Sequence, residues 1–112
     1  MTAPVYSKLL MGVFTSLPSE QFTNKPPPGF IWIVRDIDVY LGAGGSPTAM
    51  DVQVNDHSGD PYFVPITLNN PTAPFHAQWR GRQVIPSDAT LIANFVGGPW
   101  SLSISGYELS LP

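Results

Sequence analysis

The sequence predicts an all-β fold, a single antiparallel β-sandwich of seven or eight strands with a jelly-roll-like arrangement. The 13 prolines and 10 glycines divide 112 residues into pieces of about 6–12 residues, which are too short for most helices. No piece shows a sustained apolar repeat of 3.6 residues, whereas several alternate apolar and polar residues. A chain of this length suits one domain and leaves no room for a second.

Strands are expected at seven places, and three polar loops rich in proline or glycine stand out between them. The expected strands are residues 5–14, 30–41, 49–55, 62–68, 76–85, 89–96 and 100–111, and the loops are residues 16–28, 42–48 and 69–74. Residues 1–28 are interpreted as an amino-terminal arm, made of the first strand and its loop, and residues 29–112 as the sandwich body of the same domain. The apolar run after Lys8 is too short for a membrane-spanning helix and unlike a secretory signal, so we expect synthesis in the cytoplasm without export.

The strand at residues 30–41 is the longest and follows a rigid turn of three prolines and a glycine. Its first part, residues 30–34, is wholly apolar, which predicts burial of both faces. The second part alternates, so only one of its faces is expected to be covered; that part carries Ile37, Val39 and Leu41 on one face and Asp36, Asp38 and Tyr40 on the other. Phe30 and Trp32 are therefore candidate contacts with a partner if they are exposed in the isolated protomer.

Alternation also assigns the faces of the two middle strands. In residues 49–55 the apolar positions are every second residue, so they are predicted to form part of the core; they are Met50, Val52 and Val54. In residues 62–68 the same reasoning places four side chains on one face; they are Tyr62, Val64, Ile66 and Leu68. Pro65 has no amide hydrogen to donate, which predicts an edge strand or a β-bulge.

The last strand shows a phase slip. Trp100, Leu102 and Ile104 share one face, but after Gly106 the apolar series continues at Tyr107, Leu109 and Leu111. A β-bulge at Ser105–Gly106 would let both series face one core, because a bulge inserts a single residue. Gly106 is therefore a predicted bulge residue.

One pair of acidic residues and one pair of basic residues each have the two-residue spacing of a strand face. Asp36 and Asp38 form one pair, and Arg80 and Arg82 form the other. An aspartate ladder facing an arginine ladder across neighbouring strands would fix their register. The alternatives are a contact with a partner and a catalytic pair of carboxylates, which need a similar separation.

No sequence motif indicates an enzyme, a cofactor or a metal. The chain has no cysteine, and no phosphate loop, nucleophile elbow or dinucleotide fingerprint occurs. The loop at residues 55–61 is rich in oxygen ligands, with His57 among them, and such loops sometimes hold calcium. Its composition also suits a plain hairpin turn, and its spacing matches no metal loop, so we expect no metal, no cofactor and no catalytic residue.

Aromatic residues offer a second class of site, since exposed rings stack on sugars. Trp32, Trp100 and Tyr107 fall in apolar strand series and are expected in the core. Tyr40 and Trp79 lie outside these series, which makes them candidates for a glycan or a protein contact.

Composition points to a partner that is not a nucleic acid. A net charge of -3 with five Lys and Arg excludes a basic face for phosphates or a polybasic membrane contact. Only 12% of residues are charged, whereas a solvated surface usually carries about 25–35%. The low charge predicts surface that is covered in a homo-oligomer or a larger assembly.

Three phrases carry a resemblance: VRDIDV at residues 34–39, WRGRQV at residues 79–84 and SGYEL at residues 105–109. Together they resemble a family of small minor tail proteins of tailed phages that infect actinobacteria. The resemblance implies a non-enzymatic protein of the virion, made in the host cytoplasm, with other virion proteins as partners and a trimer as the expected oligomer. It supplies no active-site residue. A capsid decoration or cement protein and a receptor-binding carbohydrate module, which would bind a host surface glycan, are the alternatives.

Overall fold

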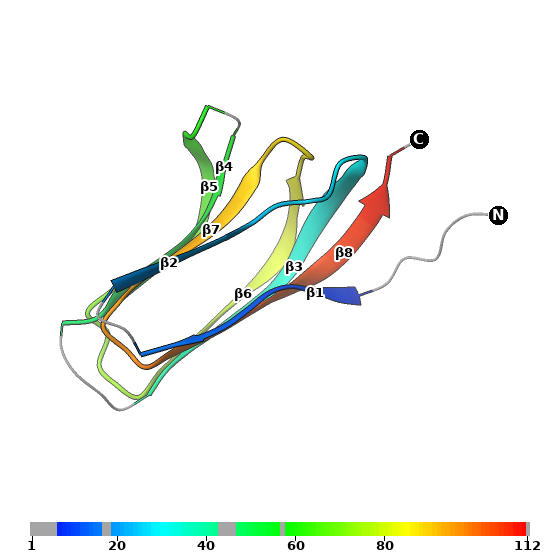
Figure 1. Cartoon of the computed structure of the whole chain (residues 1–112). Helices are drawn as coiled ribbons and strands as arrows, with labels where there is room; N and C mark the ends of the chain where they lie inside the picture. The colour runs from blue at the N-terminus through cyan, green and yellow to red at the C-terminus, as the bar shows by residue number, and fades with distance from the viewer. Residues whose placement is uncertain (1–6, 17–18, 43–46, 57, 112) are drawn as a thin grey trace.

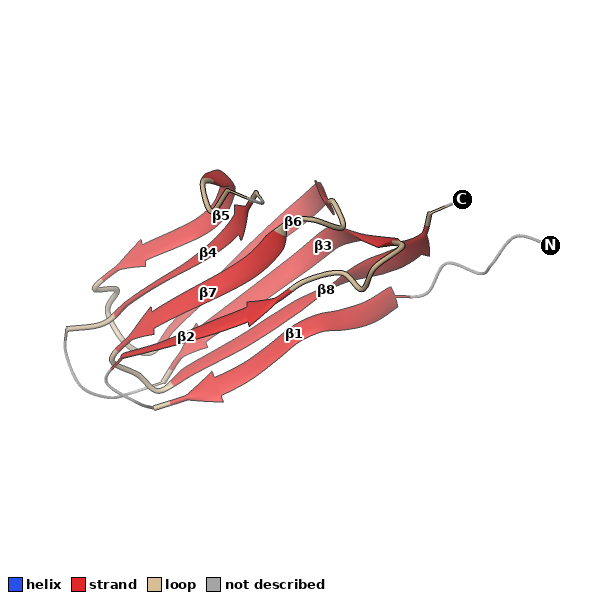
Figure 2. Ribbon diagram, turned by 45° about the horizontal axis from the view of Figure 1, so that its top comes forward, coloured by secondary structure: helices blue, strands red, loops and turns tan. Residues whose placement is uncertain are grey.

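Nearly all of the described chain is β-strand. The computed structural model describes residues 7–16, 19–42, 47–56 and 58–111, and these ranges contain eight strands and no helix (Figure 2). The strands are β1 (Ser7–Thr15), β2 (Ser19–Asn24), β3 (Phe30–Leu41), β4 (Ala49–Asn55), β5 (Pro61–Asn69), β6 (Phe75–Ile85), β7 (Thr90–Val96) and β8 (Trp100–Ser110). The predicted all-β class is confirmed.

The strands form two antiparallel sheets that pack as a sandwich (Figure 1). Sheet A has the order β1-β8-β3-β6, and sheet B has the order β2-β7-β4-β5. Apart from the β4–β5 hairpin, every connection crosses from one sheet to the other. Eight strands in two such sheets define a jelly roll, so this part of the prediction is also confirmed.

The core lies between the sheets and follows from strict alternation of the inner strands. The predicted core series of β4 and of early β8 are buried, with Val52, Trp100 and Ile104 at 0% exposure. Trp100 packs on Phe95 of the opposite sheet with ring centroids 6.1 Å apart. Its indole nitrogen donates to the carbonyl oxygen of Val96 at 3.1 Å, so the polar end of this buried ring is satisfied.

Strand β2 occupies part of the stretch expected to be a loop, residues 16–28, and that expectation is wrong. The strand pairs with β7 along its whole length and forms one edge of sheet B. Its only large apolar side chain is Phe22, which meets Phe95 edge to face at 5.9 Å. β1 lies at the edge of sheet A, so the described part of residues 1–28 contributes one strand to each sheet.

Strand β5 is both an edge strand and bulged, as Pro65 predicts. Val52 pairs with Ile66 and Val54 with Phe63, so three steps on β5 oppose two on β4. The extra residue changes the face of the side chains that precede it: Phe63 packs against the core and Val64 is 47% exposed. The prediction that Val64 shares a face with Ile66 is therefore wrong, and the side chain of Tyr62 lies outside the described part.

The bulge beside Gly106 lies on the neighbouring strand. Val34 pairs with Gly106 and Asp36 with Ser105, so the inserted residue is Arg35 of β3, and β8 continues without interruption. Gly106 is buried and allows the backbone of β3 to come close, since a Cβ there would overlap the carbonyl oxygen of Ile33. The prediction placed the inserted residue on the wrong strand, and Tyr107 lies on the outer face of sheet A, not in the core.

Candidate functional site

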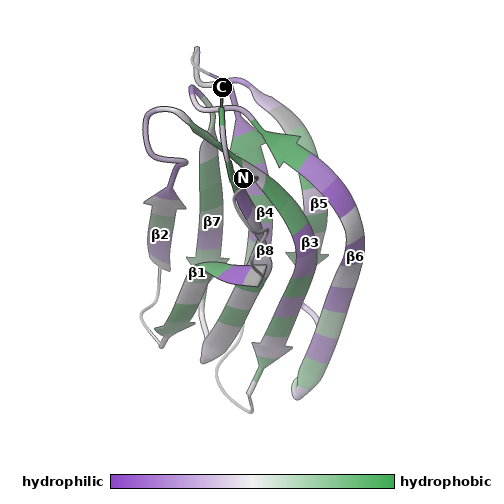
Figure 3. Cartoon of the chain, turned by 90° about the vertical axis from the view of Figure 1, so that its right-hand side faces the viewer, coloured by the Kyte–Doolittle hydropathy of each residue, from purple (hydrophilic) through white to green (hydrophobic). Residues whose placement is uncertain are grey.

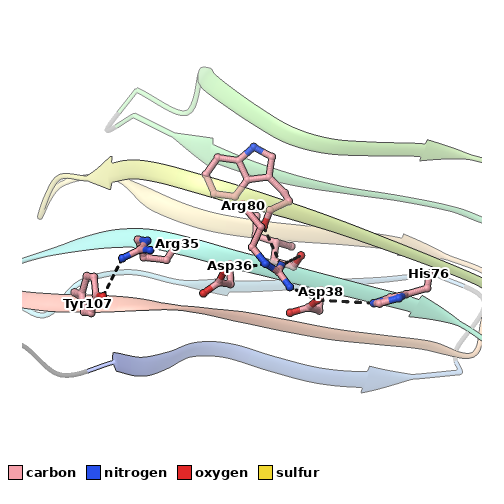
Figure 4. A network of polar contacts seen from close by, with 8 residues as sticks. Arg35, Asp36, Asp38, His76, Arg80 and Tyr107 are labelled. Atoms are coloured by element: carbon pink, nitrogen blue, oxygen red, sulfur yellow. Dashed lines mark hydrogen bonds and ion pairs between the residues drawn. The ribbon is translucent and has the colours of Figure 1, made fainter.

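The outer face of sheet A carries a row of charged side chains along β3 and β6 (Figure 4). Arg80 lies opposite Asp36 in the strand register. Its Nε is 3.1 Å from Asp36 Oδ1, and its Nη2 is 3.2 Å from Asp38 Oδ1. One guanidinium therefore bridges two carboxylates that lie on the same face of a central strand. About half of the Arg80 side chain is exposed, so this bridge is worth about 0–1 kcal/mol and acts mainly on register.

The second partner of the aspartates is His76, not the Arg82 that the sequence predicts. Between Val34 and Asp36 the register with β6 slips again, and Arg82 falls opposite the bulge, exposed. Within the described ranges Arg82 makes no ion pair with either aspartate. His76 does, with its Nε2 3.8 Å from Asp38 Oδ1. The even spacing of residues 76, 78 and 80 on one strand face was the signal that could have found it.

The bulge residue Arg35 caps the other end of this row. Its Nη1 donates to the hydroxyl oxygen of Tyr107 at 2.9 Å, and its guanidinium carbon lies 5.4 Å from the centre of that ring. A cation over an aromatic face stabilises by about 0.5–1 kcal/mol at an exposed site. The bulge thus directs the Arg35 side chain toward Tyr107, which lies on the outer face of sheet A.

The described ranges contain no cluster of three or more His, Cys, Asp or Glu side chains that would bind a metal ion. His57, in the oxygen-rich loop, lies outside the described residues. Asp56 of that loop accepts from the backbone of Ser58 at 2.9 Å and of Asp60 at 3.1 Å, which is the pattern of a turn. The described residues include no helix that is long and apolar enough to cross a membrane.

The four candidate contact residues separate into three groups. Trp32 is buried at 3% exposure, and its indole nitrogen donates to Glu108 Oε1 at 2.9 Å. Phe30 is half-buried. Trp79 is half-buried and meets Phe63 of sheet B edge to face at 5.6 Å, which closes the open side of the sandwich between β5 and β6. Only Tyr40, at 49% exposure, remains widely open to solvent.

Glu108 holds the amino-terminal and carboxy-terminal strands together at one end of sheet A. Its carboxylate accepts from the Trp32 indole and from Lys8 Nζ, the latter at 3.0 Å. These two hydrogen bonds, with the indole bond the larger cause, lower the pKa of Glu108 below its ordinary value.

An apolar cluster lies on the outer face of sheet A beyond Arg35, and we call it the end patch. The strand register places its members side by side: Ile31 opposite Leu109, and Ile33 between Tyr107 and Val84. Val84 is 47% exposed and the other four are half-buried. Figure 3 shows this end of β3 and of β6 in the apolar colour. One face of the wholly apolar part of β3 is thus covered by sheet B, and its other face is partly exposed to solvent.

Neither a protein-family model nor a curated protein matches the sequence. Several solved structures are similar to it, among them two of one virus. A chain in the structure of infectious bursal disease virus Gx strain has 12% identity and a TM-score of 0.46, and one in the Gt strain structure has 11% identity and a TM-score of 0.31. Each match covers 96% of this chain and 32% of the viral chain, so this chain spans about a third of their length. The jelly-roll assignment rests on the strand order, and these likenesses add nothing to it.

Proposed function

We propose that this chain is a non-enzymatic structural component of a phage virion, a minor tail or tail-tip protein that assembles as a homo-oligomer, with a trimer expected. The end patch is the observation that carries the proposal. It is a partly exposed apolar cluster on a molecule with few charges, and such clusters usually mark contacts with other proteins. The three phrases that resemble tail proteins support the virion as the place, and two of them supply three patch residues, Val84, Tyr107 and Leu109.

The patch has the anatomy of an interface core with a polar rim. Ile31, Ile33 and Leu109 are its apolar centre, while Arg35 and Arg82 border it with positive charge. A standard interface buries about 800 Å² per partner. The protein exposes 6289 Å², so such an interface would cover about an eighth of its surface, with the end patch at its centre. Because β-strands hold the patch rigidly, little conformational entropy is lost on docking.

The fold agrees with this role without requiring it. Jelly rolls form viral capsid domains and lectin domains, and they also form enzymes of the cupin type, so function must come from the site. The described residues form no cluster that could bind a metal ion, and both aspartates of the charged row are paired with Arg80. A contact surface is what the outer face of sheet A offers.

The test is incorporation into particles. Phages that carry Val84→Asp should yield virions depleted of the protein, because the new carboxylate is buried unpaired in the contact. Thr67→Asp, a matched charge on an exposed residue of β5, should leave incorporation unchanged. Both variants should remain folded, as judged by the urea midpoint of the purified protein. Normal incorporation of the Val84→Asp protein would refute the end patch as the contact.

The second candidate is a decoration or cement protein of the capsid, since the same patch would serve on a head. Quantitative mass spectrometry of purified particles separates the two. A copy number that scales with the capsid lattice would overturn the tail assignment, whereas a small fixed number per particle supports it.

A further inference from the structure

A hollow of about 180 Å³ opens on the outer face of sheet A, at the opposite end from the end patch. Outward side chains of the three neighbouring strands β6, β3 and β8 form it. Its aromatic and polar side chains are those of Tyr40, Asp38, His76, Ser101 and Ser103. The register explains the shape: Tyr40 lies between Ser101 and His76, and Asp38 lies opposite Ser103, so two small serines adjoin larger side chains.

The hollow is lined mostly by apolar surface, and polar groups at its border are available to hydroxyl ligands. Asp38 Oδ1 accepts from Arg80 at 3.2 Å, which holds the carboxylate in position. A positioned carboxylate accepts strong, charge-assisted hydrogen bonds from hydroxyl groups. The two serine hydroxyls can each donate and accept, as can the imidazole of His76. The Tyr40 ring adds an apolar surface with a polar tip, half open to solvent.

We infer that this hollow binds a neutral pyranose ring, with Tyr40 as the stacking platform and Asp38 as the acceptor for ring hydroxyls. A pyranose has an apolar C–H face and a rim of hydroxyls, which matches one aromatic surface beside alternating donors and acceptors. Anionic ligands are disfavoured, because Asp38 lines the hollow and no lysine or arginine is among its lining residues. The size fits one ring, since pockets for drug-sized molecules enclose about 300–1,000 Å³.

Phe14 extends the site to a second ring. It is 71% exposed on β1 and lies opposite Ser101, so Phe14 and Tyr40 flank that serine from two sides. Strands in a sheet are about 4.8 Å apart, which places the two aromatic residues about 10 Å from each other across β8. An oligosaccharide that runs across the strands can therefore contact both rings.

The test is a titration of the purified protein, followed by the backbone amide NMR signals. The probes are the methyl pyranosides of glucose, galactose, mannose and N-acetylglucosamine, and a neutral tetrasaccharide of each. We expect saturable shifts at Tyr40, Ser101 and Ser103 for at least one probe, with a dissociation constant on the order of 1 mM for a single ring. Tyr40→Ala should weaken that binding roughly tenfold. Gln78→Ala, an exposed control on the same face, should not change it.

Phe14→Ala separates the two platforms, because it should weaken the tetrasaccharide and leave the methyl pyranoside unchanged. Absence of saturable shifts with every probe overturns the inference, as does binding that survives Tyr40→Ala. Loss of Tyr40→Ala protein from virions without any sugar binding would also overturn it, since the hollow would then be a subunit contact. The inference is independent of the end patch: Val84→Asp should leave the titration unchanged.

Discussion

Substitution of Gly106 by alanine should destabilise the protein strongly. Gly106 lies on β8 opposite the bulge at Arg35, and both β8 and β3 are inner strands of sheet A. An added Cβ would overlap the carbonyl oxygen of Ile33 and come within 2.9 Å of its carbonyl carbon and 3.1 Å of Val34 Cα. These atoms belong to the backbone, so no rotation of a side chain relieves the overlap.

The expected cost follows from that geometry. Overpacking a core typically costs about 1–3 kcal/mol, and the upper end applies where the backbone itself must move. A loss of about 3 kcal/mol is a large part of the roughly 5–15 kcal/mol by which small domains are stable. With a denaturant slope of about 1.5 kcal/mol/M, the urea midpoint should fall by about 2 M.

Equilibrium unfolding in urea, followed by tryptophan fluorescence, measures this shift. Ser105→Ala is the matched control: it changes the neighbouring residue of the same strand and should alter stability by less than about 0.5 kcal/mol. A midpoint for Gly106→Ala within that same range would refute the close approach of β3 to Gly106.

Three further predictions concern individual contacts. For Arg80 and Asp36, the paired charge reversal Arg80→Asp with Asp36→Arg should recover part of the stability lost in each single variant. The coupling energy should be about 0–1 kcal/mol and should fall in high salt. Strictly additive losses would contradict the pairing. For Trp79 and Phe63, a double-mutant cycle to alanine should give a coupling of about 0.5–1.5 kcal/mol in urea unfolding, and a coupling near zero would mean that the rings do not tie the sheets together. The pKa of Glu108 is lowered in the folded state, so its contribution to the free energy of unfolding, relative to Glu108→Gln, should be present above the unfolded pKa of about 4.3. It should disappear as the pH falls through the folded pKa. Parallel curves of unfolding free energy against pH for the two proteins would contradict this.

Much of the fold could be predicted because alternation is a local signal. The buried series of β4 and of early β8 needed only the two-residue period of a strand. Strand β2 could not be found in this way, since an edge strand with Phe22 as its single large apolar residue has almost no pattern. Its pairing depends on β7, about 70 residues further along the chain, and no local signal carries that information.

The site depended on register, which the sequence does not contain. The phase slip near Gly106 signalled a bulge, but one strand's pattern cannot tell which neighbour holds the inserted residue. A register shift between β3 and β6, with the extra residue on β6, sets Arg80 rather than Arg82 against the aspartates and His76 beside Asp38. The end patch could be predicted only in part. The apolar run in β3 is evident in the sequence, whereas Val84 and Leu109 are identified as its neighbours only by the strand pairing.

A reconstruction of the intact virion at side-chain resolution tests the central claim most directly. The account predicts that copies of this jelly roll occupy the tail, with Ile33, Val84 and Leu109 of each copy packed against a neighbouring subunit and shielded from solvent. A virion in which these three side chains face solvent, or particles that do not contain the protein, would contradict it.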